Sequence, residues 1–152
     1  MDDLFYSAAL TGLLAAVCLW IAIVDFRQHR IPDWASLPLI GIGLAISGMV
    51  SGIALPERLI GTGVSFLLLW GIGEAYFRWR NEEALGIGDA KLFAAAGAWL
   101  GWTALPAVML IATTMGLAFA ALRPGRGQKR LAFGPWLAAG LVICWLRVVL
   151  RI

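Results

Sequence analysis

The chain has 152 residues, of which 61% are hydrophobic and 14% are charged, and its formal net charge is +3. A soluble domain averages about 45–50% apolar and about 25% charged residues, so this composition indicates an integral membrane protein. The positive charge does not predict nucleic-acid binding, because the basic residues form short clusters between apolar runs, a pattern that orients spans in a bilayer.

The first apolar run, Leu4 to Val24, contains no charge and is long enough to cross a bilayer. The N-terminus reads MDD and has no basic n-region, so we expect this run to be a retained span and not a cleaved leader. Cys18 and Cys144 lie inside apolar runs, and the sequence has no CxxC motif. Neither a disulfide framework nor a metal site is predicted from them.

Further spans are predicted from Trp34 to Leu55, from Leu59 to Phe77 and from Leu131 to Leu146. The uncharged run from Leu92 to Leu122 is ambiguous, because one helix of this length would measure about 47 Å, against a hydrocarbon core of roughly 30 Å. The alternative is a hairpin of two short helices that turns near residues 101–106, where a proline suits a helix start.

The distribution of basic residues favours the hairpin. With six spans, nine of the twelve Lys and Arg residues lie in inner loops or at an inner helix end, and only Arg58, Arg147 and Arg151 lie outside. A single long helix would place the segment RPGRGQKR outside, against the positive-inside rule. We therefore predict an all-α polytopic membrane protein, a single membrane-embedded domain over residues 1–152 with about six transmembrane helices and both termini outside.

Four acids at the predicted helix ends are the candidate functional residues, since ionisable groups at membrane depth are costly. Asp25 ends the first span, where the helix dipole disfavours a negative charge, so it points to chemistry. Asp33 starts the second span and fits a first-turn acid. Glu74 precedes Arg78 by four residues, so an ion pair within one helix is its ordinary interpretation. A contact with a basic substrate is the alternative.

Asp89 follows two glycines in the sequence GIGDAK. It could cap the next helix, but a cap does not require Gly86 and Gly88, which permit a close backbone approach that other residues forbid. Lys91 is either an interfacial lysine or part of the same motif.

Asp25 and Asp89 are both predicted at the inner side, on helices that can meet in a bundle. Two adjacent carboxylates share one proton. The ionised group can then activate a water while the protonated group donates to a carbonyl oxygen, which needs no metal or cofactor.

The segments DFRQHRIPDW, GEAYFRWRNEEALGIGD, GIGDAKLFAAAGAWLG and AFGPWLAAG resemble, in order, four segments of the type IV prepilin peptidases, which are aspartic membrane proteases with a GxGD motif. The resemblance covers nearly the whole chain. It implies catalytic aspartates at Asp25 and Asp89, with Gly86 and Gly88 as the motif glycines and Lys91 beside them. Asp33 departs from the family pattern, which has Asn there.

The resemblance also implies the reaction: cleavage of a basic leader from a prepilin or pseudopilin helix, at the cytoplasmic face of the bacterial inner membrane, without a cofactor. Many members also carry a cytoplasmic region with paired CxxC motifs and N-methyltransferase activity; this sequence has neither and resembles the short, peptidase-only forms. Glu74, Glu82 and Glu83 are candidate contacts for the basic leader.

Two other functions remain open from the sequence. One is a GxGD protease for other membrane substrates such as preflagellin. The other is a small proton-coupled transporter that uses Asp25, Glu74 and Asp89 as a proton path. Transport predicts acids near the bilayer midplane and repeated half-helices, whereas these acids cluster at one face and the sequence shows no repeat.

Overall fold

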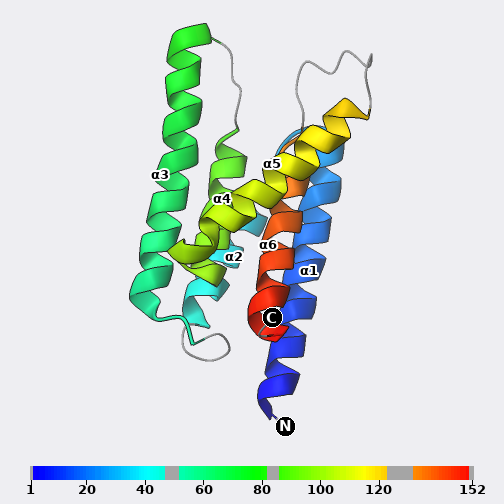
Figure 1. Cartoon of the computed structure of the whole chain (residues 1–152), viewed down its shortest axis with the longest axis vertical. Helices are drawn as coiled ribbons and strands as arrows, with labels where there is room; N and C mark the ends of the chain where they lie inside the picture. The colour runs from blue at the N-terminus through cyan, green and yellow to red at the C-terminus, as the bar shows by residue number, and fades with distance from the viewer. Residues whose placement is uncertain (1, 47–51, 82–85, 123–131, 151–152) are drawn as a thin grey trace.

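The computed structural model describes residues 2–46, 52–81, 86–122 and 132–150, and within these ranges all regular secondary structure is helical. Figure 1 shows the helices as a bundle. They are α1 (Asp2–Gln28), α2 (Asp33–Ala45), α3 (Leu55–Arg80), α4 (Ile87–Leu100), the 3-10 turn η1 (Trp102–Ala104), α5 (Leu105–Ala121) and α6 (Gly134–Leu150).

Helix α4 is the centre of the bundle. Every residue from Leu92 to Leu100 is buried, and the helix packs against α2, α3 and α6. The run of alanines and Gly97 lets the backbones come close: a Cβ added at Gly97 would overlap the backbone of Gly61 on α3. Small residues at such interfaces are typical of membrane helices. The AAAGAW sequence therefore places α4, with Asp89 in its first turn, inside a rigid ring of helices.

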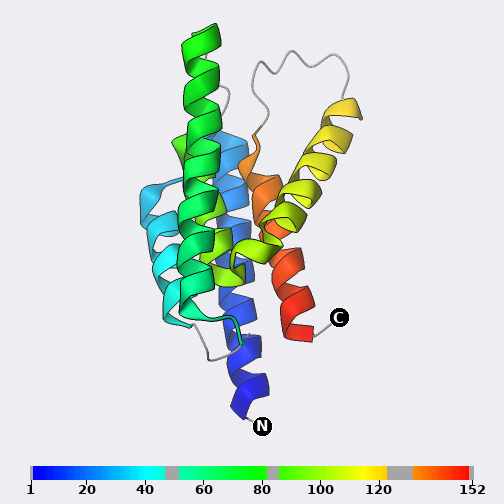
Figure 2. The same ribbon diagram turned by 60° about the vertical axis from the view of Figure 1, so that its left-hand side comes forward.

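The predicted hairpin between residues 92 and 122 is confirmed. Helix α4 ends at Gly101, which has a φ of 72°, and α5 begins after η1 with Pro106 in its first turn. Glycine adopts this left-handed conformation without the strain that other residues incur. Helix α5 then leans away from α3, so that the two helices diverge toward the end of the bundle where α4 begins (Figures 1 and 2).

The predicted span boundaries are wrong in several places. The span expected from Trp34 to Leu55 ends as a helix at Ala45, and Leu55 already belongs to α3, where Pro56 lies in the first turn. Helix α1 continues beyond Val24 to Gln28, and α6 ends at Leu150 instead of Leu146. An uncharged run shows where charges stop and not where backbone hydrogen bonds end, so these boundaries could not be located by charge alone.

Arg58 lies between two predicted spans in the sequence, but it is completely buried in the first turns of α3. Its guanidinium donates to the carbonyl oxygens of Gly43 (2.6 Å) and Ala98 (3.0 Å), near the ends of α2 and α4. A guanidinium has five donors in a fixed plane, so one side chain can satisfy carbonyls from two helix ends at once.

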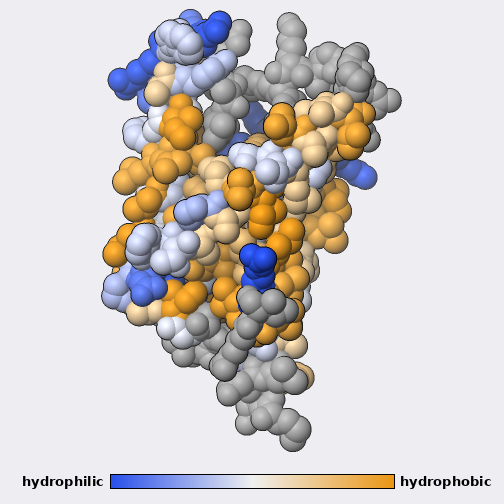
Figure 3. Space-filling view, in the orientation of Figure 1, coloured by the Kyte–Doolittle hydropathy of each residue, from blue (hydrophilic) through white to orange (hydrophobic). Residues whose placement is uncertain are grey.

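Three helical segments are long and apolar enough to cross a membrane: Phe5–Gln28, Leu55–Arg80 and Trp102–Ala121; Asp33–Ala45 and Gly134–Leu150 are apolar but shorter. Apolar residues cover much of the flank of the bundle, and hydrophilic residues gather at the end of α3 (Figure 3). Helix α1 begins and α6 ends toward the same end of the bundle. This architecture fits a protein with several spans in a bilayer.

Candidate active site

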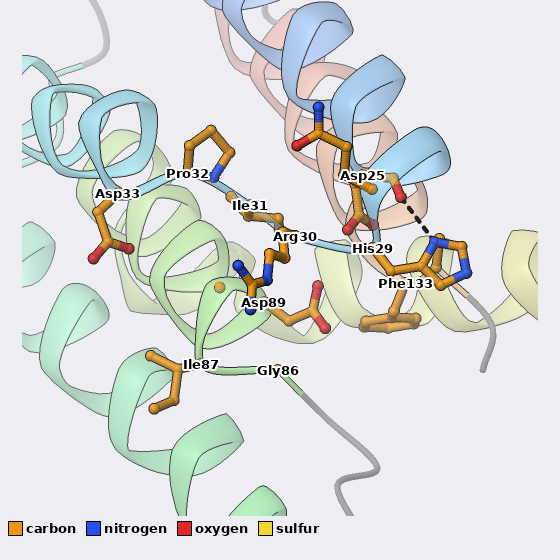
Figure 4. Close-up of a pocket in the computed structure, with 13 residues that line it drawn as sticks. Asp25, His29, Arg30, Ile31, Pro32, Asp33, Gly86, Ile87, Asp89 and Phe133 are labelled. Atoms are coloured by element: carbon orange, nitrogen blue, oxygen red, sulfur yellow. Dashed lines mark hydrogen bonds between the residues drawn. The ribbon is translucent and has the colours of Figure 1, made fainter.

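Asp25 and Asp89, which are 64 positions apart in the sequence, line the same cavity of about 670 Å³. Asp25 lies in the last turn of α1, and Asp89 lies in the first turn of α4. Their side chains extend into this cavity from the two helices (Figure 4). The predicted meeting of the two acids at one end of the bundle is therefore what the structure shows.

The cavity owes its shape to a sharp connection between α1 and α2. Helix α1 ends at Gln28, and the next residue, His29, has a left-handed φ of 52°. The His29 amide donates to the Asp25 carbonyl oxygen at 2.9 Å. The His29 ring nitrogen Nδ1 lies 3.2 Å from the same oxygen (Figure 4). Pro32 then adopts an extended conformation and precedes α2, as expected for a proline at a helix start.

Ile31 fixes this connection against the rest of the bundle and was not identified from the sequence. A Cβ added at Gly88 would lie 2.8 Å from the Ile31 Cβ, and one added at Gly134 would lie 2.9 Å from the Ile31 Cδ1. The Ile31 side chain thus fits between glycines of α4 and α6. Its signal in the sequence was the IP pair within the segment DFRQHRIPDW.

The two motif glycines differ in what they do. Gly88 permits the close approach that the sequence predicted, because a side chain at this position would collide with Ile31. Gly86 does not: a Cβ there would lie 3.8 Å from Asp89 Oδ2, an ordinary contact. Gly86, not Asp89, occupies the N-cap position of α4, and the Asp89 amide donates to its carbonyl oxygen at 3.0 Å. Asp89 is therefore not the cap of this helix.

Asp25 is only 5% exposed, and its Oδ2 atom accepts no hydrogen bond from the described part of the chain. Asp89 is partly exposed to the cavity and precedes the apolar run that begins at Leu92. Burial, followed by the neighbouring charge of Asp25, raises the pKa of the Asp89 carboxyl to about 7, although the Gly86 backbone opposes the shift. Two carboxyl groups that interact in this way retain one proton near neutral pH.

Asp33 and Lys91 form an ion pair of 2.6 Å that joins the first turn of α2 to α4. Lys91 is thus neither a lone interfacial lysine nor a cavity residue, whereas Asp33 lines the cavity. Glu74 forms the predicted ion pair with Arg78 at 2.9 Å. It also lines a smaller hollow of about 290 Å³ that shares Gly86 and Ile87 with the cavity. Glu82 and Glu83 lie outside the described residues.

Among the described residues, no group of three or more His, Cys, Asp or Glu side chains could hold a metal ion. Two interacting carboxyl groups, Asp25 and Asp89, line a cavity that is open to water. Arg30, His29 and Asp33 are the other charged or titratable residues that line it. Such a pair can act as a general base and a general acid on one substrate.

Comparisons with known proteins identify a family for this chain. Residues 12–121 match the type IV leader peptidase family. The chain is 38% identical over 128 residues to a prepilin leader peptidase/N-methyltransferase of Escherichia coli, 41% over 133 residues to one of Burkholderia pseudomallei and 41% over 145 residues to one of Dickeya chrysanthemi.

These alignments cover 82%, 85% and 89% of this chain and 57%, 43% and 51% of the respective relatives. The chain thus spans about half the length of the relatives it matches. No solved structure matches it.

Proposed function

The chain belongs to the type IV leader peptidase family, and from this premise we propose that it is a membrane aspartic endopeptidase for prepilins or pseudopilins. Asp25 and Asp89 are the catalytic residues of the proposal. The observation that carries it is their convergence on one cavity from helices that are distant in sequence. The relatives are prepilin leader peptidases, and this supports the substrate class.

The reaction uses one ionised and one protonated carboxyl group. The ionised group removes a proton from water, the water oxygen attacks the carbonyl carbon of the scissile peptide, and the protonated group donates its proton to the carbonyl oxygen. The C–N bond of the resulting diol then breaks. The leaving amine takes a proton from the first carboxyl group, and a hydroxyl of the diol returns one to the second, which restores the starting state.

The proposal places the substrate at the end of the bundle where α1 ends and α4 begins. We assign this end to the cytoplasmic face of a bacterial inner membrane, with six spans and both termini outside, because this orientation satisfies the positive-inside rule. The apolar helix of the prepilin remains in the bilayer, and its leader reaches the cavity. Lipid and the substrate helix are the partners of this proposal.

Glu74 is proposed as a contact for the basic leader, because it lies on the hollow that adjoins the cavity. Its ion pair with Arg78 is solvent-exposed, and such pairs contribute at most about 1 kcal/mol, so a leader can replace Arg78. Glu74→Lys is expected to raise KM for a substrate with a basic leader and to leave KM unchanged for one with a neutral leader. An equal KM change for both leaders would contradict this role.

The decisive experiment is cleavage of a candidate prepilin by the purified protein in detergent, with the products identified by mass spectrometry. We expect cleavage at the leader boundary by the unchanged protein and none by Asp25→Asn or Asp89→Asn, because Asn cannot act as a base or carry the shared proton. Substantial cleavage by the Asp89→Asn protein at matched amounts would overturn the proposal.

A further inference from the structure

Asp25 poses an electrostatic problem that the two-carboxylate chemistry does not solve. It lies in the last turn of α1, where the exposed carbonyl groups disfavour a negative charge. It is also almost fully buried, which costs an ionised group its hydration. Neither Asp25 oxygen is part of an ion pair in the described part of the chain. Something else must stabilise the anion if Asp25 is to work as a base.

The start of α6 lies against this carboxylate. A Cβ added at Gly134 would lie 2.7 Å from Asp25 Oδ2 and 3.1 Å from its Cγ, closer than atoms can pack. The Gly134 backbone amide interacts with the same carboxyl group. Gly134 is the first residue of α6, and the amide groups of a first helical turn carry partial positive charge toward an anion in front of them.

The sequence of this first turn leaves the Gly134 amide available. The amides of Trp136 and Leu137 both donate to the carbonyl oxygen of Phe133, at 3.1 and 3.2 Å. Pro135 has no amide hydrogen. Of the amides in this turn, that of Gly134 is therefore the one left to face Asp25. In the sequence FGPW, Gly134 offers a free amide donor and has no side chain that could block it. Pro135 then favours the start of the helix.

The other groups that face Asp25 do not provide the same stabilisation. Asp89 from α4 and Asp33 from α2 are acids, and Arg30 in the connection lines the cavity without an ion pair to Asp25. The His29 ring contacts the Asp25 main-chain oxygen, and its charge favours the ionised carboxylate less than the Gly134 amide does. Helix α5 contains no ionisable residue, and the titratable residues of α6, Cys144 and Arg147, are ten or more positions from Gly134.

We propose that Gly134 is a positioning residue whose backbone N–H holds the Asp25 carboxylate in its ionised form, so that Asp25 is the general base and Asp89 carries the shared proton. This inference rests on the proposed function. It explains the contact at Gly134, because any side chain there would displace the base.

The test replaces the Gly134 residue by glycolic acid in cell-free synthesis, which exchanges the N–H for an ester oxygen without adding volume. We expect the midpoint of the acid limb, where kcat/KM rises with pH, to shift to higher pH by about one unit. The reason is the loss of a hydrogen bond to a charged group. Gly134→Ala adds the colliding Cβ and should reduce kcat further.

Gly140→Ala is the matched control, because a Cβ there would lie 2.8 Å from the Val108 carbonyl oxygen on α5, an equally tight contact on the same helix but far from Asp25. It should lower thermal stability and leave the acid limb in place. An ester variant with the profile of the unchanged protein would overturn the inference, and so would an equal shift in Gly140→Ala.

Infrared difference spectra near pH 6, taken between the unchanged protein and its Asp25→Asn or Asp89→Asn variant, test the assignment even if the Gly134 variants do not fold. Asp25→Asn should remove an ionised carboxylate band and Asp89→Asn a protonated carboxyl band; the reverse pattern would refute the inference. Failure of the unchanged protein to cleave any prepilin, or full activity of Asp25→Asn, would instead contradict the proposed function itself.

Discussion

At the scale of the residue, two carboxyl groups with different surroundings share one cavity. Asp25 is held against the backbone of α6, and Asp89 lies in the first turn of its own helix. Asp33, a third acid in the same cavity, is paired with Lys91. The three acids therefore have separate roles in our proposal: base, proton donor and a link between α2 and α4.

The first prediction separates the proposed pair from Asp33. Asp25→Asn and Asp89→Asn should each reduce turnover by at least about 10²-fold, the lower range for general acid–base catalysis, and the double variant should be hardly worse than either, because the two groups act as a unit. Asp33→Asn should keep most activity, since Asn can still accept a hydrogen bond from Lys91. A cleavage time course of the four variants checks this; loss of activity in Asp33→Asn alone would mean that another pair is catalytic.

The second prediction concerns pH. The pKa of Asp89 is raised from 3.8 to about 7, so the folded protein retains a proton that the unfolded chain loses between these values. The stability that this proton provides is fully present below pH 3.8 and is lost as pH rises through 7. We expect the unfolding temperature in detergent to decline from pH 5 to pH 8, and this decline to be smaller in Asp89→Asn. An identical pH dependence in both proteins would contradict the shift.

The activity profile should show the same group. Cleavage requires one proton on the pair, so kcat/KM should fall as pH rises through about 7. The Asp33→Asn protein is the control for general effects of pH on this end of the bundle, and its alkaline limb should remain close to that of the unchanged protein.

At the scale of the element, α4 controls the position of the site. It is buried from Leu92 to Leu100 and touches α2, α3 and α6. The C-terminal end of α4 is held by Trp99, which donates to the Leu39 carbonyl oxygen at 2.8 Å, and by Arg58. The N-terminal end of α4 carries Asp89. These two contacts are at the opposite end from the chemistry, so their effect on stability can be tested separately from catalysis.

The third prediction tests this separation. Arg58→Met removes the donors to Gly43 and Ala98, and a buried carbonyl left without a partner costs about 1–3 kcal/mol. We expect a clearly lower unfolding temperature with unchanged kcat in the folded fraction. Arg147→Met, at an exposed arginine of α6, is the matched control and should have little effect on unfolding. A reduced kcat in folded Arg58→Met protein would show that the two ends are coupled.

At the scale of the whole molecule, the bundle places both candidate acids at the end where α1 finishes, while α1 begins and α6 ends toward the opposite end. With three long apolar helices and two shorter ones, this arrangement fits several crossings of a bilayer. Our proposal that the cavity opens on the cytoplasmic side rests on the charge distribution.

The fourth prediction is the orientation. Single cysteines introduced as Gln28→Cys, Asn81→Cys and Gly127→Cys should react with a membrane-impermeant probe only from the cytoplasmic side; Gly127 lies outside the described residues. A fusion tag at either terminus should be reached only from the other side. Labelling of Gly127→Cys from outside would contradict the predicted topology. Unmodified Cys18 and Cys144 are buried and should give little background.

The sequence by itself determined the helical class, the hairpin at residues 101–106, the Glu74–Arg78 pair and the two candidate acids. These features depend on local properties: apolar content, turn residues, spacing along one helix and charges at span ends. Resemblance to a family identified Asp25 and Asp89 as partners. Only the tertiary structure decided that Arg58 is buried between helix ends, that Asp33 binds Lys91, and that Gly134 and Ile31 surround Asp25. Each of these joins residues from different helices, and a pattern along one chain does not contain the packing that brings them together.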